Sequence, residues 1–255
     1  MRTNMKRTFG LSIALCLGFV WGCAEVEVLI PPHLSSGLKH QGPDDDPGST
    51  PISLKELKQI QANKKPMCNR NGSMMLDVRH ERQRTPFWCW AETSRMVMEY
   101  QNELAGSSTK TQCEIVTDSL GRKLGKANCC ETQSSTDFIP PRNCLRGEWP
   151  SVVFERYGFN YMTVAEALDE ESLINEICGN GPFLYVVNLR GGGKHALVAE
   201  GYDATIEEKP IVRIYDPTQD DYEDQAYDEF AGVAPDARIH YRDYVQISPK
   251  AKDKS

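Results

Sequence analysis

The sequence lacks two features that would each define a class of protein: an apolar run long enough to cross a membrane and an excess of basic residues. The apolar run at residues 9–20 is interrupted by Gly10 and Ser12, and it is shorter than the ~20 residues of a membrane-spanning helix. The 255 residues contain 29 Lys and Arg against 36 Asp and Glu, which gives a formal net charge of −7. Nucleic-acid binding requires clustered cations that neutralise phosphates, so this acidic balance argues against a nucleic-acid partner.

The first 22 residues have the organisation of an export signal. Basic residues precede the apolar run, and the segment VWGC at residues 20–23 resembles a bacterial lipobox, in which the cysteine is lipidated and becomes the mature N-terminus. We therefore predict a signal peptide at residues 1–22 and membrane attachment through a lipid on Cys23, with ordinary cleavage and secretion as the alternative. Ala24, rather than aspartate, follows the cysteine. By the rule for Gram-negative lipoproteins this predicts an exported bacterial protein anchored in the outer membrane, facing the periplasm or the surface.

The nine cysteines fit an exported protein, because disulfides form and persist in oxidising compartments. Six remain when Cys16, Cys23 and Cys89 are set aside, and an even number is compatible with three disulfides in any of 15 connectivities. Zinc is disfavoured because the one vicinal pair lacks the C-x-x-C spacing and has no histidine nearby. We expect neither a metal nor a cofactor. The six disulfide candidates are Cys68, Cys113, Cys129, Cys130, Cys144 and Cys178.

Residues 23–66 have the composition of a flexible tether or pro-segment. They include the Pro31-Pro32 pair and a run of three aspartates at residues 44–46. A short helical pattern is present at residues 54–60. The globular domain is predicted to span residues 67–250 and to be followed by a tail at residues 251–255. This length suits a single domain, which we expect to be monomeric.

The periodicity of the globular part changes from helical to β-like along the chain. Residues 89–102 have apolar side chains seven and four apart and contain neither glycine nor proline, so a helix is predicted to begin at Cys89. Further helices are predicted at residues 115–124 and 150–157. Helices followed by strands indicate an α+β domain with an antiparallel sheet. The predicted strands are residues 183–189, 196–202, 211–215 and 238–247.

Cys89 is the candidate nucleophile at the start of the first predicted helix. The positive end of the helix dipole and the free N–H groups at that position lower a thiol pKa. Taken alone, a cysteine between two tryptophans is more often a buried core residue. What favours a nucleophile is the string QRTPFWCWA at residues 83–91, which has a glutamine six residues before the cysteine.

This string resembles the Q-x5-C-W-A pattern of the compact bacterial branch of the papain-like cysteine peptidases. In that family the glutamine side-chain amide and the cysteine backbone N–H form the oxyanion hole, so the resemblance implies this role for Gln83 and Cys89. It also implies a papain-like fold. In such a fold an N-terminal helical part carries the cysteine at a helix start, and a C-terminal antiparallel sheet carries a histidine and an aspartate.

The predicted strands supply that histidine and aspartate. The family's base is a histidine at the start of a strand after a glycine-rich turn, and the string GGGKHALV at residues 191–198 supplies His195. A carboxylate on the next strand would fix the imidazole tautomer, and IYDP at residues 214–217 supplies Asp216. We prefer Asp216 to Asp203, because Asp203 lies eight residues further along the strand of His195 at ~3.3 Å per residue. The histidines without this context are His33, His40, His80 and His240.

The resemblance covers residues 76–247. The sequence departs from the eukaryotic members: it lacks their C-G-[SA]-C-[WY] signature, its His195 follows Cys89 by 106 residues, and it has an aspartate where papain has an asparagine. Because of these departures, the substrate preferences of the lysosomal enzymes do not transfer to this sequence. Looser matches to the bacterial branch are Gln112-Cys113, Cys129-Cys130, Cys144, Trp149-Pro150 and residues 157–159.

The resemblance implies an exported thiol peptidase that hydrolyses a protein or peptide substrate through an acyl-enzyme. Two alternatives stay open. A protein glutamine deamidase or acyl transferase would use the same triad, and a catalytically silent surface-binding lipoprotein would keep the fold without the activity. An enzyme is favoured because a binding protein has no need of all four site residues, which are Gln83, Cys89, His195 and Asp216.

Overall fold

The computed structural model describes residues 46, 48–64, 68, 71–105, 110–125, 127–130, 140–189, 192–206, 210–235 and 238–251, all within the unit His40–Ser255. The predictions for the signal peptide, for Cys16 and for the lipid on Cys23 lie outside these residues, as does the tail beyond residue 251. Among the described helices, none is both long and apolar enough to span a membrane.

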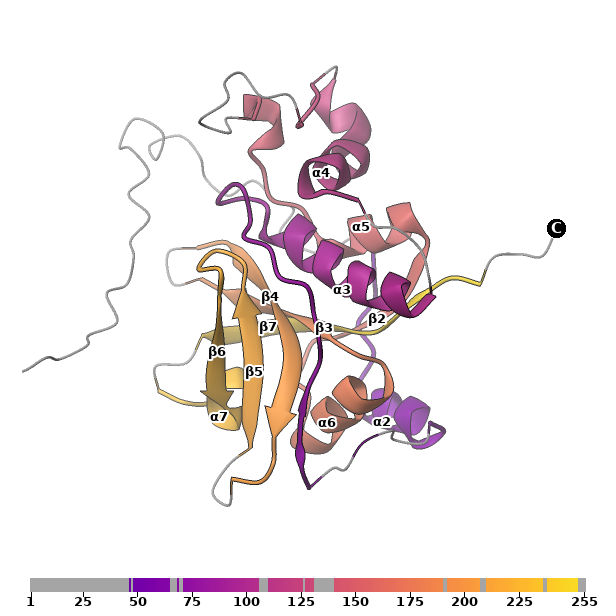
Figure 1. The fold of residues 1–255 in the computed structure, drawn as a ribbon, viewed down its shortest axis with the longest axis vertical. Coiled ribbons are helices and arrows are strands. Elements are labelled where there is room, and N and C mark those ends of the chain that lie inside the picture. Colours follow the sequence, from indigo (N-terminus) through magenta and orange to yellow (C-terminus); the bar gives the residue numbers. More distant parts are fainter. Residues whose placement is uncertain are drawn as a thin grey trace, which may run out of the picture. The chain divides into compact units, whose positions relative to one another are not determined.

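An antiparallel sheet of seven strands organises the structure (Figure 1). Six strands follow the order β2-β7-β3-β4-β5-β6, and β1 pairs with the end of β4 that β3 does not reach. Helices and an antiparallel sheet together form the α+β architecture that the sequence predicted. The strands are β1 (Ser73–Met75), β2 (Phe159–Val164), β3 (Phe183–Asn188), β4 (Lys194–Asp203), β5 (Ile211–Asp216), β6 (Asp221–Ala226) and β7 (Ile239–Pro249).

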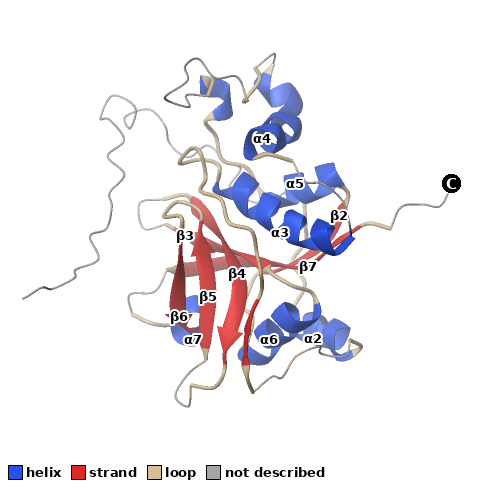
Figure 2. Ribbon diagram, in the orientation of Figure 1, coloured by secondary structure: helices blue, strands red, loops and turns tan. Residues whose placement is uncertain are grey.

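Helices cover both faces of the sheet because the strands send apolar side chains alternately to either face. On β3, Leu184 and Val186 pack with helices α3, α4 and α5, whereas Tyr185 and Val187 pack with α2, α6 and α7. Figure 2 shows α3, α4 and α5 gathered on one side of the strands. The helices are α2 (Leu54–Ala62), α3 (Cys89–Ala105), α4 (Gln112–Leu120), α5 (Pro150–Tyr157), α6 (Glu170–Gly179) and α7 (Tyr227–Phe230), with short 3-10 helices at Gly121–Leu124 and Arg142–Cys144.

The predicted helices and strands are all present, and the structure adds several that were not predicted. The predicted helices correspond to α3, to α4 with the 3-10 turn that follows it, and to α5, and the predicted strands correspond to β3, β4, β5 and β7. The largest omission is α6. Asp169 caps it by accepting a hydrogen bond from the Ser172 N–H (2.9 Å), and its apolar face is buried. A capping aspartate before apolar residues at helical spacing is the signal that would have found this helix.

Residues 48–64 pack against the sheet and α6, which differs from the flexible segment expected from their composition. Ile52 forms a parallel bridge with Val164 of β2. Ser53 and Glu56 form a capping box that starts α2, and Leu57 one turn later is fully buried in the core. The short helical pattern therefore marks a docked amphipathic helix, and the packed part of the chain begins before residue 67.

All six cysteines that the sequence singled out form disulfides, and the structure selects one connectivity. The bridges are Cys68–Cys178, Cys113–Cys130 and Cys129–Cys144. The vicinal cysteines therefore take different partners. Among the described residues, Cys89 is the one free cysteine. Three bridges are consistent with an extracellular or periplasmic protein.

Candidate active site

Cys89 is the first residue of α3, and its side chain is buried. The two flanking tryptophans fix this end of the helix. The Trp88 indole N–H donates to the Cys144 carbonyl (2.8 Å), and the Trp90 indole N–H donates to the Arg146 carbonyl (3.3 Å). The thiol is thus held at the positive end of the helix dipole, as the sequence predicted.

His195 and Asp216 meet at the ends of two neighbouring strands. His195 lies at the beginning of β4 and Asp216 at the end of β5, and antiparallel pairing brings these ends together. His195 Nε2 lies 2.8 Å from Asp216 Oδ1, and the Thr218 N–H also donates to that oxygen (2.9 Å). The competing candidate Asp203 lies at the opposite end of β4, where its carboxylate accepts hydrogen bonds from Thr205. The geometry therefore selects Asp216 as the partner of His195.

The Cys89 sulfur accepts hydrogen bonds from the His195 ring and from the N–H groups of Trp90 and Ala196. Burial is the largest influence on this thiol and would raise its pKa. The hydrogen bond and charge of His195, helped by the backbone donors, outweigh burial and hold the pKa below its usual value. Burial also disfavours a charged His195, but Asp216 and Cys89 raise the His195 pKa well above its usual value. The geometry thus favours a thiolate and an imidazolium.

Asp216 is ionised although it is buried. Burial would raise its pKa, but the hydrogen bond and charge of His195, the Thr218 N–H and the Arg238 guanidinium together hold the pKa below its usual value. Arg238 Nη2 lies 3.7 Å from Asp216 Oδ2 and 2.8 Å from Glu223 Oε1. Sequence reasoning found neither Thr218 nor Arg238. Arg238 carries no local motif, and the return of the chain into β7 is what brings it to the carboxylate.

Gln83 lies on the segment that leads into α3, and hydrogen bonds join it to both halves of the site. Its backbone N–H donates to the Pro217 carbonyl (2.8 Å), next to Asp216. Its side-chain Nε2 donates to the Thr85 carbonyl (2.8 Å), which also accepts from the Trp88 N–H (3.2 Å) at the start of α3. The Thr85 bond uses one of the two hydrogens on this amide nitrogen.

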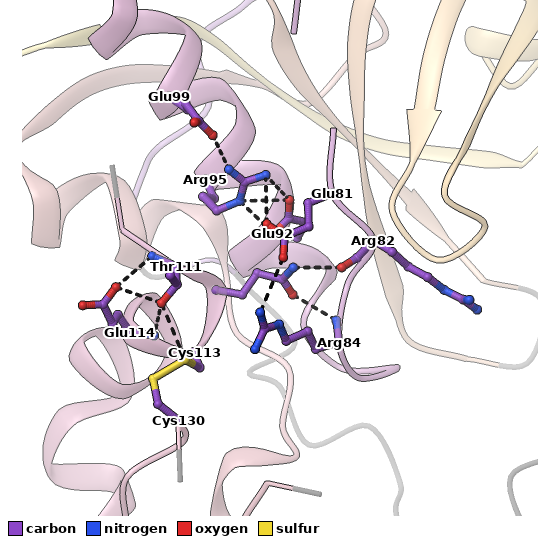
Figure 3. A network of polar contacts seen from close by, with 11 residues as sticks. Glu81, Arg82, Arg84, Glu92, Arg95, Glu99, Thr111, Cys113, Glu114 and Cys130 are labelled. Atoms are coloured by element: carbon purple, nitrogen blue, oxygen red, sulfur yellow. Dashed lines mark hydrogen bonds and ion pairs between the residues drawn. A yellow bond between two sulfur atoms is a disulfide. The ribbon is translucent and has the colours of Figure 1, made fainter. Parts of the chain in front are cut away.

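A buried ion cluster lies one turn further along α3 (Figure 3). Arg95 Nε lies 3.0 Å from each carboxylate oxygen of Glu92, and Arg95 also binds Glu99. Burial is the largest of the influences that raise the Glu92 pKa to about 8; nearby Glu81 and Glu99 raise it further, and Arg95 opposes them. Arg95 Nη2 also lies 3.7 Å from Glu81 Oε2. The cluster therefore connects α3 to the segment that carries Gln83.

The residues predicted from the sequence are linked into one hydrogen-bonded site. It offers a thiol with a lowered pKa, an imidazole with a raised pKa, a carboxylate hydrogen-bonded to the ring and a side-chain amide donor. These are the groups that nucleophilic acyl transfer requires. Within the described ranges, no three or more His, Cys, Asp or Glu side chains gather in a way that could hold a metal ion.

Comparison with known proteins gives the family. Residues 72–234, more than half of the chain, match the family described as papain-like cysteine protease AvrRpt2. Similar solved structures include xylellain, a cysteine protease from Xylella fastidiosa, with 13% identity, a TM-score of 0.47, and coverage of 81% of this chain and 92% of that chain. Another is digestive procathepsin L 3 of the Tenebrio molitor larval midgut, with 13% identity, a TM-score of 0.46, and coverage of 72% and 71%. No curated protein sequence matches the chain.

The family match and the α+β fold with a cysteine at a helix start define the class of this protein as a papain-like cysteine peptidase. Within that class, the chain belongs to the family of the papain-like cysteine protease AvrRpt2. The matched region spans all four candidate site residues, from Gln83 to Asp216.

Proposed function

We propose that this peptidase hydrolyses peptide bonds of a protein or peptide substrate with Cys89 as nucleophile, His195 as acid and base, and Asp216 as the group that orients His195. The observation that carries the proposal is the continuous series of hydrogen bonds from the Cys89 sulfur through the imidazole to the Asp216 carboxylate. Because Nε2 is hydrogen-bonded to Asp216, Nδ1 is the ring nitrogen that exchanges a proton with the Cys89 sulfur.

In the first half of the reaction, the Cys89 thiolate attacks the peptide carbonyl carbon and forms a C–S bond. The electron pair of the carbonyl moves to its oxygen, where the Gln83 amide and the Cys89 backbone N–H stabilise the charge. Collapse of this intermediate breaks the C–N bond, and the His195 imidazolium gives its proton to the leaving amine. A thioester on Cys89 remains.

In the second half, neutral His195 removes a proton from a water molecule that attacks the thioester carbonyl. Collapse of the second tetrahedral intermediate expels the Cys89 thiolate and releases the carboxylic acid product. The proton now on His195 restores the original ion pair. Throughout both halves, Asp216 holds the ring in one orientation and one tautomer.

We further propose that the protein is exported and attached to the membrane through a lipid on Cys23. The signal-like residues 1–22 and the lipobox-like residues 20–23 support export, and the three disulfides support an oxidising compartment. Metabolic labelling with palmitate is expected to mark the native chain and to fail in Cys23→Ala. Equal labelling of the two chains would contradict attachment at this residue.

Product analysis tests the proposed reaction. The purified chain is incubated under mildly reducing conditions with a library of peptides from a digested bacterial proteome, and mass spectrometry identifies the products. New amino termini are expected and support hydrolysis. Release of ammonia from glutamine side chains without new termini would indicate the deamidase instead. The absence of both products would favour the third alternative, a catalytically silent protein that uses the fold to bind a partner.

A further inference from the structure

We infer that Gln112, the first residue of α4, is a positioning residue for the oxyanion hole, because its side-chain amide holds the peptide groups on both sides of Gln83. The inference rests on the proposed function, which gives the Gln83 amide its role. It concerns a residue that the sequence offered as a loose match without any role.

The Gln112 amide makes two short hydrogen bonds to the segment that carries Gln83. Its Nε2 donates to the Arg82 carbonyl (2.8 Å), and its Oε1 accepts from the Arg84 N–H (2.9 Å). Figure 3 draws both bonds as dashed lines that end at Arg82 and Arg84. The Gln83 N–H itself donates to the Pro217 carbonyl (2.8 Å). Three consecutive residues are thus each held through the backbone, which fixes the direction in which the Gln83 side chain leaves the chain.

The two ion pairs of Glu81 hold the residues around Gln83 less firmly than the Gln112 hydrogen bonds do. Arg84 and Arg95 each lie 3.7 Å from a carboxylate oxygen of Glu81, and the side chains of Arg84 and Glu81 are 44% and 46% exposed. Long ion pairs with solvent-exposed partners contribute little to stability. Loss of the Gln112 amide, by contrast, removes the partners of two backbone groups in a partly buried segment. The Gln112 bonds are therefore the short contacts that hold the backbone of residues 82–84 to α4.

Gln112 is itself held firmly. Thr111 and Glu114 form a capping box at the start of α4. The next residue along the chain, Cys113, is bridged to Cys130. Gln112 is 1% exposed, so its side chain has little rotational freedom. A rigid second layer of this kind is what keeps a catalytic donor within the small tolerance that catalysis requires.

The effect of Gln112 should be confined to steps that develop charge on the substrate oxygen. A misplacement of ~1 Å in such a site can lower a rate by ~100-fold. The thiolate does not depend on Gln112, because His195 and the N–H groups of Trp90 and Ala196 hold the sulfur. Hydrolysis and simple alkylation of Cys89 should therefore respond differently to a change at Gln112.

Gln112→Met tests this difference, since methionine keeps a similar volume and makes neither hydrogen bond. We expect kcat/KM for the best-cleaved library peptide to fall by about 10- to 100-fold. Iodoacetamide alkylation of Cys89 forms no oxyanion, so its rate should stay within about two-fold of the native rate. Gln61→Met is the matched control and should leave both rates unchanged. Gln61 is equally a buried glutamine, but its Nε2 donates to the Ser172 carbonyl (3.0 Å) on the opposite face of the sheet.

A double-mutant cycle separates positioning from a general weakening of the fold. Gln83→Ala is expected to lower kcat/KM by about 10²- to 10³-fold. Adding Gln112→Met to Gln83→Ala should lower it little further, because the donor that Gln112 positions is already gone. Losses that multiply would overturn the inference. A full kcat/KM in Gln112→Met would also overturn it, as would equal losses of hydrolysis and alkylation.

Gln112→Glu serves as the second variant if Gln112→Met does not give the native circular dichroism spectrum. Glutamate keeps the acceptor for the Arg84 N–H and loses the donor to the Arg82 carbonyl, and the same contrast between hydrolysis and alkylation is expected. Failure of the native chain to cleave any library peptide would overturn the proposed function. Cleavage that is insensitive to Gln112 would overturn the present inference alone.

Discussion

Cys89→Ala is expected to abolish peptide hydrolysis, with kcat/KM reduced at least about 10⁵-fold, because no other group in the site can form the thioester. The fold should survive, since alanine fits the space of the cysteine side chain and continues the helix. Initial rates with a cleaved library peptide measure the loss. Labelling by an irreversible thiol-peptidase inhibitor, located by peptide mapping, should disappear from residues 89–102 at the same time.

Ser94→Ala is the matched control for this substitution. Ser94 is buried on the next turn of α3, and its hydroxyl donates to the Trp90 carbonyl (2.7 Å) without touching the reacting groups. The variant should retain native kcat/KM. Hydrolysis that persisted in Cys89→Ala would remove Cys89 from the mechanism, whatever the control shows.

His195→Ala is expected to lower kcat/KM by about 10⁴-fold and to change the pH at which Cys89 becomes reactive. In the native chain, His195 holds the Cys89 pKa below its usual value, so alkylation should already be fast below pH ~8.5, the range of a free thiol. Without His195, burial remains and raises the thiol pKa. The alkylation rate of the variant should therefore rise only above the usual thiol range. Iodoacetamide alkylation rates measured from pH 5 to pH 10 give the pH profile of each protein, and the midpoints of the two profiles are compared with that of a free thiol.

The fall of native activity at alkaline pH is expected to come from His195 and not from Cys89. Hydrolysis needs a proton on His195, and the raised His195 pKa keeps that proton well above the usual histidine range. Activity should therefore persist above neutral pH and fall at higher pH as the imidazolium deprotonates.

His240→Ala is the control for these pH effects. His240 also has an aspartate beside its imidazole, with a side chain that is 7% exposed and Nε2 3.1 Å from Asp243 Oδ1, but it lies on β7. Its removal should leave the alkylation profile of Cys89 where it is. An unshifted profile in His195→Ala, or the same shift in both variants, would show that His195 does not control the thiol.

The sequence predicted the parts of the site that depend on short segments. Gln83 and Cys89 stand six residues apart in one string, and the family resemblance pointed to His195 and Asp216 through the strand and turn that flank each of them. Thr218, Arg238 and Gln112 were not assigned roles, because each acts through a backbone or carboxylate group that folding brings to it. Local patterns carry no information about such partners.

The fold shows the same division. Elements with strong apolar periodicity, such as α3 and β4, were found close to their observed bounds. Residues 48–64 were predicted to be flexible because their composition is polar, yet two buried side chains, Leu57 and Gln61, dock the helix. The pairing of the six cysteines was left open, because spacing along a chain does not determine which sulfurs meet.

The low pKa of Cys89 also has a consequence for the lifetime of the enzyme. A thiolate is the form of cysteine that peroxides oxidise to a sulfenic acid, and a second thiol nearby normally intercepts that product as a disulfide. In the described part of the chain, every other cysteine is already bridged, so no thiol within that part can capture an oxidised Cys89. Burial protects the sulfur from peroxides. A thiol from outside these residues would have to return a sulfenic acid to the active form before further oxidation makes the loss permanent.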